Sequence, residues 1–371
     1  MADFLRIAVI MAGGSGERFW PLSRRHRPKQ LLRLATDQQT LLEEAIERIE
    51  PLVPPERIFV ITAAALVTPI REAHTGLPDE NILGEPAKRN TAGALTWAAA
   101  HILANFAAQS AEKTSIAVLT ADHRIGDRQG FAATVQSALT AAEQTGALVT
   151  IGVPPERPET GFGYIEVPPD ATPLLATDPP VLPVARFLEK PDRPTAEAFL
   201  RDGRHFWNSG MFFWRLDRFL EELNGSAPAH AQAALSMALA MANRDPEAAA
   251  RIFTELEDIS IDYALMERAG RVAMARAAFD WDDVGAWDAL DRNRARDAAG
   301  NVAVGDPVLV DSRDCIVYNA EGADAIAVGV VGMEGVVVVV SRDGVLVVPK
   351  DRAQDVKQVV GELKQRGAKQ L

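Results

Sequence analysis

Two hydrophobic periodicities alternate along the first half of the chain. Short and almost uninterrupted apolar runs are typical of strands that are buried on both faces of a sheet. Between these runs, apolar residues recur at the spacing of an amphipathic helix. We therefore expect strands at residues 5–11, 57–62, 115–121 and 147–153, and helices at residues 40–49, 91–108 and 130–143.

Strands that alternate with helices of this length imply β–α–β units and a parallel sheet with helices on both faces. Ligands of such sheets bind at the carboxyl ends of the strands. The predicted fold class is therefore α/β, with a Rossmann-like, mostly parallel sheet. A helical block is expected at residues 216–256, followed by a last core element at residues 272–279.

Prolines crowd residues 154–194. Because proline is excluded from central strands, we expect loops, an edge strand and a lid there rather than core.

The C-terminal region has a different pattern, with valine-rich runs at residues 335–341 and 344–350 separated by turn residues. This pattern predicts a small all-β module, closed by a helix at residues 353–365. We expect one domain over residues 1–297 and this module over residues 298–371. A flat, valine-rich surface of this kind is expected to pack on a second copy, which predicts a homodimer.

Composition narrows the class of protein. The 371 residues carry a formal net charge of −12 and a single cysteine, Cys315. An internal disulfide and a cysteine-based metal finger are therefore excluded, and an acidic chain is a poor binder of nucleic acid. The N-terminal segment lacks the features of a signal peptide, and no apolar run has the length of a membrane span. We expect a soluble, cytoplasmic protein without nucleic-acid or membrane partners.

A glycine cluster follows the first expected strand, at Gly13, Gly14 and Gly16. Glycines let backbone N–H groups approach phosphate oxygens closely. Positive charge is concentrated in the following residues, against the acidic balance of the chain, and this favours a polyphosphate site. The Rossmann pattern is excluded because Phe19 stands where its third glycine is needed. The Walker A pattern is excluded because Gly16 is not followed by Lys-Ser or Lys-Thr. The basic side chains are Arg18, Arg24, Arg25, Arg27 and Lys29.

The run GGSGERFWPLSRRHRPKQLL resembles the signature of the sugar-1-phosphate nucleotidyltransferases, and within them the mannose-1-phosphate guanylyltransferase branch. The resemblance extends over about residues 5–290. It implies that the loop around Ala12, Gly13, Gly14 and Gly16 holds the nucleotide phosphates. It also makes Arg18 and Lys29 the catalytic cations, with Lys29 beside the α-phosphate. For the C-terminal module it implies a left-handed β-helix, although a two-sheet roll also fits the valine pattern.

The segment before the second expected helix resembles the part of this family that binds the base and ribose. It contains Glu85, Arg89, Asn90 and Thr91. A Glu85 carboxylate would accept the N1–H and N2–H₂ donors of guanine, which uracil and thymine lack. Alternatively, Asn90 or Thr91 simply caps the helix.

Two aspartates resemble the metal ligands of the family. Asp122 follows the third expected strand, and Asp283 lies in a segment that resembles W-x-D-V-G-x-W. Two carboxylates together with substrate phosphates suffice for Mg²⁺, which is the expected cofactor. Asp280 and Asp282 are alternatives to Asp283, and a capping role is the alternative for Asp122.

Three short motifs resemble the sugar-binding part of the family. They are G-F-G-Y-I-E, F-L-E-K-P and W-N-S-G-M-F, each a weak pattern when taken alone. The resemblance implies that the sugar and its phosphate are bound by Gly163, Tyr164, Glu166, Glu189, Lys190 and Asn208.

The resemblance implies transfer of GMP from GTP to α-D-mannose 1-phosphate, with GDP-mannose and pyrophosphate as products. A uridylyl- or thymidylyltransferase acting on glucose 1-phosphate is the nearest alternative. A non-catalytic sugar-nucleotide sensor and a nicotinamide-dependent oxidoreductase are alternatives of other classes. The oxidoreductase is disfavoured because the second expected strand of this chain does not end in the acidic residue that such enzymes need.

Overall fold

The computed structural model describes residues 4–320 and 326–371. The chain forms two compact units, which are described separately below. The first unit comprises Met1–Met11, Ile46–Thr120 and Ile125–Asp280, and the second comprises Ala12–Ala45, Ala121–Arg124 and Trp281–Leu371. The glycine-rich segment thus belongs to the same compact unit as the C-terminal module. The expected division of the sequence at residues 297 and 298 stays a prediction.

The first unit is built on a sheet with the strand order β3-β2-β1-β4-β10-β6-β11-β8, to which β7 and β9 are joined through β10. The pairs β1–β2, β1–β4, β2–β3 and β6–β11 are parallel. Strand β10 is antiparallel to both of its central neighbours. The predicted α/β class with a mostly parallel sheet is confirmed. The strands are β1 (Leu5–Met11), β2 (Ile58–Ala63), β3 (Ile82–Glu85), β4 (Thr114–Thr120), β6 (Leu148–Val153), β7 (Gly163–Glu166), β8 (Val181–Pro183), β9 (Arg186–Glu189), β10 (His205–Arg215) and β11 (Val272–Arg276).

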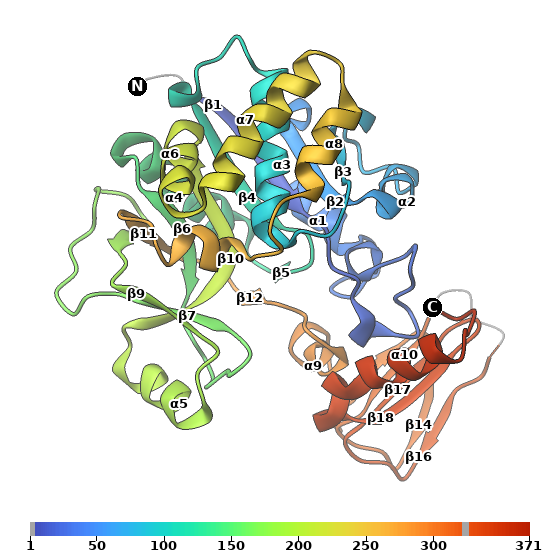
Figure 1. The fold of residues 1–371 in the computed structure, drawn as a ribbon. Helices are drawn as coiled ribbons and strands as arrows, with labels where there is room; N and C mark the ends of the chain where they lie inside the picture. Colours follow the sequence, from blue (N-terminus) through green and yellow to red (C-terminus); the bar gives the residue numbers. More distant parts are fainter. Residues whose placement is uncertain (1–3, 321–325) are drawn as a thin grey trace. The chain divides into compact units, whose positions relative to one another are not determined.

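Helices cover both faces of this sheet. Alternate side chains of a strand point to opposite faces, so neighbouring residues of β1 contact different helices. Ile7 and Val9 of β1 share a hydrophobic core with α3 and α7, which lie together with α8 in Figure 1. The neighbouring Arg6 instead bonds Glu143 of α4, with Nε–Oε1 at 2.8 Å. The helices are α2 (Val67–Glu72), α3 (Asn90–Asn105), α4 (Arg128–Thr145), α5 (Arg193–Asp202), α6 (Leu216–Ser226), α7 (Pro228–Ala242) and α8 (Pro246–Thr254).

The proline-rich segment 154–194 contains the predicted edge strands, since β8 ends the sheet order and β9 pairs only with β7, but it also contributes to the core. It contains β7, β8 and β9, and it contributes the fully buried Tyr164, Ile165 and Val181 to the interior. Ile165 packs in a hydrophobic cluster with Phe206 of β10. Only the expectation that this segment lies outside the core was wrong, because β7 contains no proline and pairs with β10 in the sheet.

The second unit confirms the β-helix expectation. Strands β13, β15 and β17 pair in parallel in one sheet, while the intervening β14 and β16 pair in parallel in another. Successive strands therefore alternate between two sheets, as coils of a β-helix do, and the two-sheet roll is excluded. Strand β18 closes the first sheet in an antiparallel direction. The strands are β13 (Val302–Val304), β14 (Val308–Val310), β15 (Ile316–Asn319), β16 (Gly329–Val331), β17 (Val336–Val340) and β18 (Val345–Pro349).

The closing helix α10 (Val356–Gln365) is also present as predicted. Its Val356 and Val360 are buried in one hydrophobic core with Phe19 of the glycine-rich segment and Trp287. This shared core fixes the glycine-rich segment to the C-terminal module. The remaining elements are α1 (Leu41–Ile49), β5 (Arg124–Ile125), β12 (Trp281–Asp282) and α9 (Leu290–Asn293). No helix in the described part of the chain is long and apolar enough to cross a membrane.

Candidate active site

The glycine-rich loop continues directly from β1, and the Asp122 segment continues from β4. These two strands are parallel neighbours, with Met11 opposite Thr120, so the segments leave the sheet side by side. Gly16 has a φ of 63°, and a Cβ atom there would lie 2.3 Å from Cβ of Lys29. A glycine is therefore required at this position for Lys29 to pass the loop.

The buried Lys29 connects the two predicted metal-binding aspartates. Its Nζ donates to Oδ2 of Asp122 at 2.9 Å and to the backbone carbonyl oxygen of Asp283 at 2.7 Å. Burial favours the neutral form of Asp122. The positive charges of Lys29 and His123, together with hydrogen bonds to the carboxylate, outweigh this effect and hold the pKa of Asp122 below its usual value. Asp122 is therefore an anion at neutral pH.

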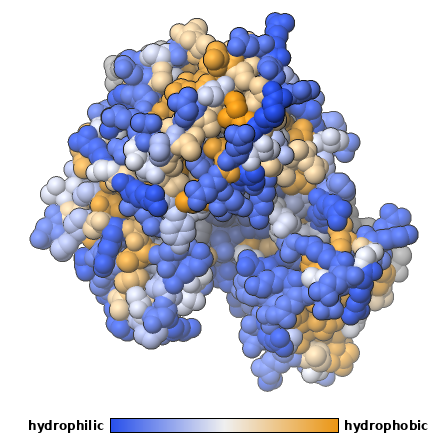
Figure 2. Space-filling view, in the orientation of Figure 1, coloured by the Kyte–Doolittle hydropathy of each residue, from blue (hydrophilic) through white to orange (hydrophobic). Residues whose placement is uncertain are grey.

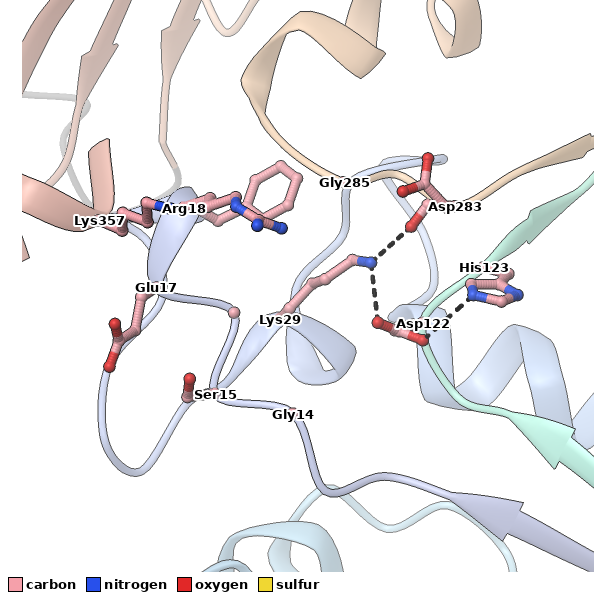
Figure 3. Close-up of a pocket in the computed structure, with 12 residues that line it drawn as sticks. Gly14, Ser15, Glu17, Arg18, Lys29, Asp122, His123, Asp283, Gly285 and Lys357 are labelled. Atoms are coloured by element: carbon pink, nitrogen blue, oxygen red, sulfur yellow. Dashed lines mark hydrogen bonds and ion pairs between the residues drawn. The ribbon is translucent and has the colours of Figure 1, made fainter. Parts of the chain in front are cut away.

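These residues line a pocket of about 350 Å³ within the second unit (Figure 3). Of the predicted residues, the structure brings together Gly14, Gly16, Arg18, Lys29, Asp122 and Asp283 in its lining. Ala12 is buried behind the loop, where its carbonyl oxygen accepts a bond of 2.6 Å from Nε2 of Gln30. The further lining residues are Ser15, Glu17, Phe19, His123, Gly285 and Lys357.

The structure distinguishes Asp283 from its alternatives. The buried Asp282 accepts from Nε of Arg292 at 2.5 Å and from the backbone N–H of Val284 at 2.7 Å. Asp282 thereby stabilises the turn in which Val284 has a φ of 46°. Asp280 is exposed and belongs to the first unit. Asp283 is thus the member of this acidic segment that lines the pocket.

The basic run contributes less to the pocket than expected. Arg24 forms an ion pair with Asp343, with Nη2–Oδ1 at 2.7 Å, and neither Arg25 nor Arg27 is among the lining residues. Lys357, from α10, takes a place on the pocket wall that the sequence analysis did not predict. Nothing in the sequence connects this helix to the glycine loop, because only the fold brings the two together.

In the first unit, Glu85 ends β3, and α3 begins soon after it. Burial raises the pKa of Glu85 to about 7. The N-cap position of α3 is Arg89, which makes no side-chain capping bond, while Oδ1 of Asn90 accepts from the backbone N–H of Thr91 at 2.9 Å. The Thr91 hydroxyl accepts from the backbone N–H of Ile261 at 2.8 Å.

The predicted sugar-binding residues divide between two faces of the β7–β9 pair. Gly163 lies opposite Glu189, and a Cβ atom on Gly163 would lie 2.7 Å from Oε2 of Glu189 and 3.7 Å from Cβ of Asn208. Gly163, Glu189 and Asn208 are therefore close together on one face. Lys190 forms an ion pair with Glu189.

Tyr164 and Glu166 lie apart from this group, and their role in sugar binding stays a prediction. Tyr164 is the strand neighbour of Gly163, so its side chain points to the opposite face, where its hydroxyl donates to the Glu159 carbonyl at 2.8 Å. Glu166, two residues further on, shares that face and forms ion pairs with Arg186 and Arg204.

Asp262 is a residue of this group that sequence reasoning missed. It begins the π-helical turn Asp262–Met266, and its Oδ1 accepts from Nδ2 of Asn208 at 2.9 Å. The Asn208 side-chain oxygen in turn accepts from the backbone N–H of Gly210 at 3.2 Å, and because that group can only donate, the amide orientation is fixed. Burial, and then the negative charge of Glu189, raise the pKa of Asp262. An acid directly before the run Tyr263–Met266, which has no charged residue, was the available signal.

The described residues include no group of three or more His, Cys, Asp or Glu side chains arranged to hold a metal ion. A site for a hard cation would therefore rely on fewer protein ligands, completed by oxygens of a bound substrate. Asp122 and Asp283 supply such oxygens in one pocket.

Comparison with known proteins identifies the family. A family model described as Nucleotidyl transferase matches residues 7–299. The chain belongs to the nucleotidyltransferase family. A second model, described as the MannoseP isomerase/GMP-like beta-helix domain, matches residues 305–363 of this nucleotidyltransferase.

Relatives cover almost the whole nucleotidyltransferase chain. The alginate biosynthesis protein AlgA of Pseudomonas aeruginosa is 38% identical over 97% of this chain and 73% of its own length. A mannose-1-phosphate guanylyltransferase of Escherichia coli K12 is 37% identical over 99% of this chain and 75% of its own. A crystal structure from Thermus thermophilus, described as a mannose-1-phosphate geranyltransferase, is 36% identical with a TM-score of 0.83, and covers 97% of this chain and 99% of its own.

Proposed function

We propose that this nucleotidyltransferase transfers GMP from GTP to α-D-mannose 1-phosphate and releases pyrophosphate. The observation that carries the proposal is the meeting of Lys29, Asp122 and Asp283 beside a glycine loop in one pocket. The similarity to relatives named mannose-1-phosphate guanylyltransferase supports the choice of substrates. We also propose a cytoplasmic location, as expected from the sequence.

The reaction is an in-line displacement at the α-phosphorus of GTP. A phosphate oxygen of mannose 1-phosphate forms the new P–O bond, and the bond to the β-phosphate oxygen breaks, so that pyrophosphate carries away the electron pair. The sugar phosphate is largely ionised near pH 7, and no general base is needed. The protein contributes positioning and charge neutralisation, for which Lys29 and Arg18 are the proposed cations.

We propose Mg²⁺ as the cofactor, held by Asp122 and Asp283. The donor set fits this ion, because carboxylate oxygens are hard ligands and Mg²⁺ accepts one or two of them together with substrate phosphates. Mg²⁺ would neutralise phosphate charge and orient the triphosphate. Lys29 bonds Asp122 in the structure, which keeps the ammonium inside the pocket close to the proposed position of the α-phosphate.

The first unit supplies the proposed specificity residues. We assign the guanine donors to the Glu85 carboxylate and the ribose to Arg89, Asn90 and Thr91. We assign Lys190 to the sugar phosphate, and Glu189 and Asp262 to the sugar hydroxyls. Asn208 orients Asp262 through the bond between them. Gly163 remains in this group because it leaves room for Glu189.

We propose that the β-helix unit mediates a homodimer. Several of its valines are strongly exposed, among them Val331 (67%) and Val347 (64%), the latter on the edge strand β18. Figure 2 shows apolar residues at the surface of this C-terminal region. An exposed apolar edge of this kind favours association with a second copy.

A matrix of nucleoside triphosphates against sugar 1-phosphates, followed by pyrophosphate release, tests the function. We expect turnover to be fastest with GTP and mannose 1-phosphate. Preference for UTP or dTTP with glucose 1-phosphate would replace this assignment with the uridylyl- or thymidylyltransferase alternative. Release of pyrophosphate from none of the pairs would leave the non-catalytic sensor.

A further inference from the structure

The closing helix α10 is fixed against the glycine-rich segment within the second unit. Nζ of Lys364 lies 2.5 Å from Oε1 of Glu17, and the indole N–H of Trp20 donates to the backbone oxygen of Gln370 at 2.9 Å. Val356 and Val360 of the helix are buried in one core with Phe19. The position of α10 beside the loop is thus determined by buried apolar contacts as well as by polar ones.

One face of α10 is directed towards the loop. Residues seven positions apart lie on the same side of a helix, so Lys357 shares the face of Lys364, which contacts Glu17. Lys357 lines the pocket, and Figure 3 shows it beside Arg18, on the opposite side from Asp122 and Asp283. The C-terminal module therefore contributes a cation to the pocket wall.

The two ends of the pocket differ in their charge balance. At one end, the Lys29 ammonium is bonded to Asp122 and to the Asp283 carbonyl, so much of its charge is compensated. At the other end, Glu17 is paired with Lys364, which leaves the positive charges of Arg18 and Lys357 in excess. A polyphosphate extending from Lys29 would place its most highly charged end near Arg18 and Lys357.

We propose that Lys357 is a phosphate-binding residue for the β- and γ-phosphates of the nucleoside triphosphate and for the pyrophosphate product. The inference rests on the proposed function, because that reaction defines which phosphates leave. A lysine ammonium suits this role as a point charge that follows a moving, flexible phosphate group. The β-helix module thereby completes the nucleotide site in addition to any role in association.

Steady-state kinetics of Lys357→Ala, in both reaction directions, tests this role. We expect the KM for GTP and the KM for pyrophosphate to rise about tenfold, as expected for the loss of one charge-assisted contact. The KM for mannose 1-phosphate should change less than about twofold by the same reasoning, because the lost contact is to the leaving phosphates. Lys357→Arg should recover most of the loss. Unchanged KM values for both GTP and pyrophosphate would overturn the assignment.

Lys369→Ala is the matched control, because it removes the same charge from an exposed position near the same end of the chain and outside the pocket lining. It should leave all the KM values unchanged, and an equal effect of both variants would contradict a specific role. Thermal unfolding of Lys357→Ala should match that of the unmodified protein.

Calorimetric titration with inorganic pyrophosphate separates this inference from the proposed function. If no substrate pair is turned over, the proposed function fails. Weaker pyrophosphate binding by Lys357→Ala than by Lys369→Ala would still support the phosphate site. Equal binding by the two variants would exclude it, whatever the activity.

Discussion

The ammonium of Lys29 lies 2.9 Å from a carboxylate oxygen of Asp122 and 2.7 Å from the backbone oxygen of Asp283. The two acceptor oxygens are therefore no farther apart than the sum of these distances. One cation joins residues from three remote parts of the sequence. This arrangement is the physical basis of the proposed phosphate chemistry.

Lys29→Ala should lower kcat by about 10²–10³-fold, the typical loss when one preorganised donor to a transition state is removed. Turnover of GTP with mannose 1-phosphate measures the effect. The comparison is Lys113→Ala, which removes a lysine from the first unit. Near-normal turnover of a folded Lys29→Ala protein would contradict the catalytic role.

Glu85 should make GTP binding depend on pH. Burial raises its pKa to about 7, and only the ionised carboxylate can accept both guanine donors. Protonation therefore removes the acceptor as the pH falls through 7. The KM for GTP should rise about tenfold from pH 8 to pH 6, since the ionised fraction of a group with this pKa falls by about that factor over the same range. Glu85→Gln should lose this dependence, whereas Glu80→Gln, at an exposed position, should keep it.

Asp262→Asn should raise the KM for mannose 1-phosphate about tenfold while leaving the KM for GTP unchanged. The carboxylate bonded to Asn208 is the proposed acceptor for the sugar hydroxyls, and an amide is a weaker partner. Asp170→Asn, an exposed aspartate in the same unit, provides the comparison. A rise in the KM for GTP alone would place Asp262 in another role.

Gly16→Ala should destabilise the second unit and lower activity. The new Cβ atom would lie 2.3 Å from Cβ of Lys29, and the φ of 63° disfavours any side chain. We expect a loss of about 1–3 kcal/mol in the free energy of unfolding, in the range for strained backbone positions. Gly14→Ala meets nothing within 4 Å and should unfold at the same temperature as the unmodified protein. Equal unfolding temperatures for both variants would contradict this account.

The sequence predicted the elements whose periodicity is undisturbed, such as β1 and α10. It missed β10, whose pairing shifts between Asn208 and Phe212, where Gly210 has a φ of 69°. Such an interruption hides the alternation that would reveal a strand.

The same limit applies to the site. Asp122 and Asp283 were predicted from motifs, whereas Lys357 reaches the pocket only through the packing of α10. Tyr164 and Glu166 lie on the other face of their strand from Gly163, and a motif of adjacent residues does not state which face each one takes.

The most direct test of the central claim is an anomalous difference map from crystals grown with GTP and Mn²⁺, which replaces Mg²⁺ and is detectable by its scattering. We predict one manganese peak in contact with carboxylate oxygens of both Asp122 and Asp283 and with the triphosphate, and no such peak for Asp122→Asn. A nucleotide-bound peak that contacts neither aspartate would contradict the account.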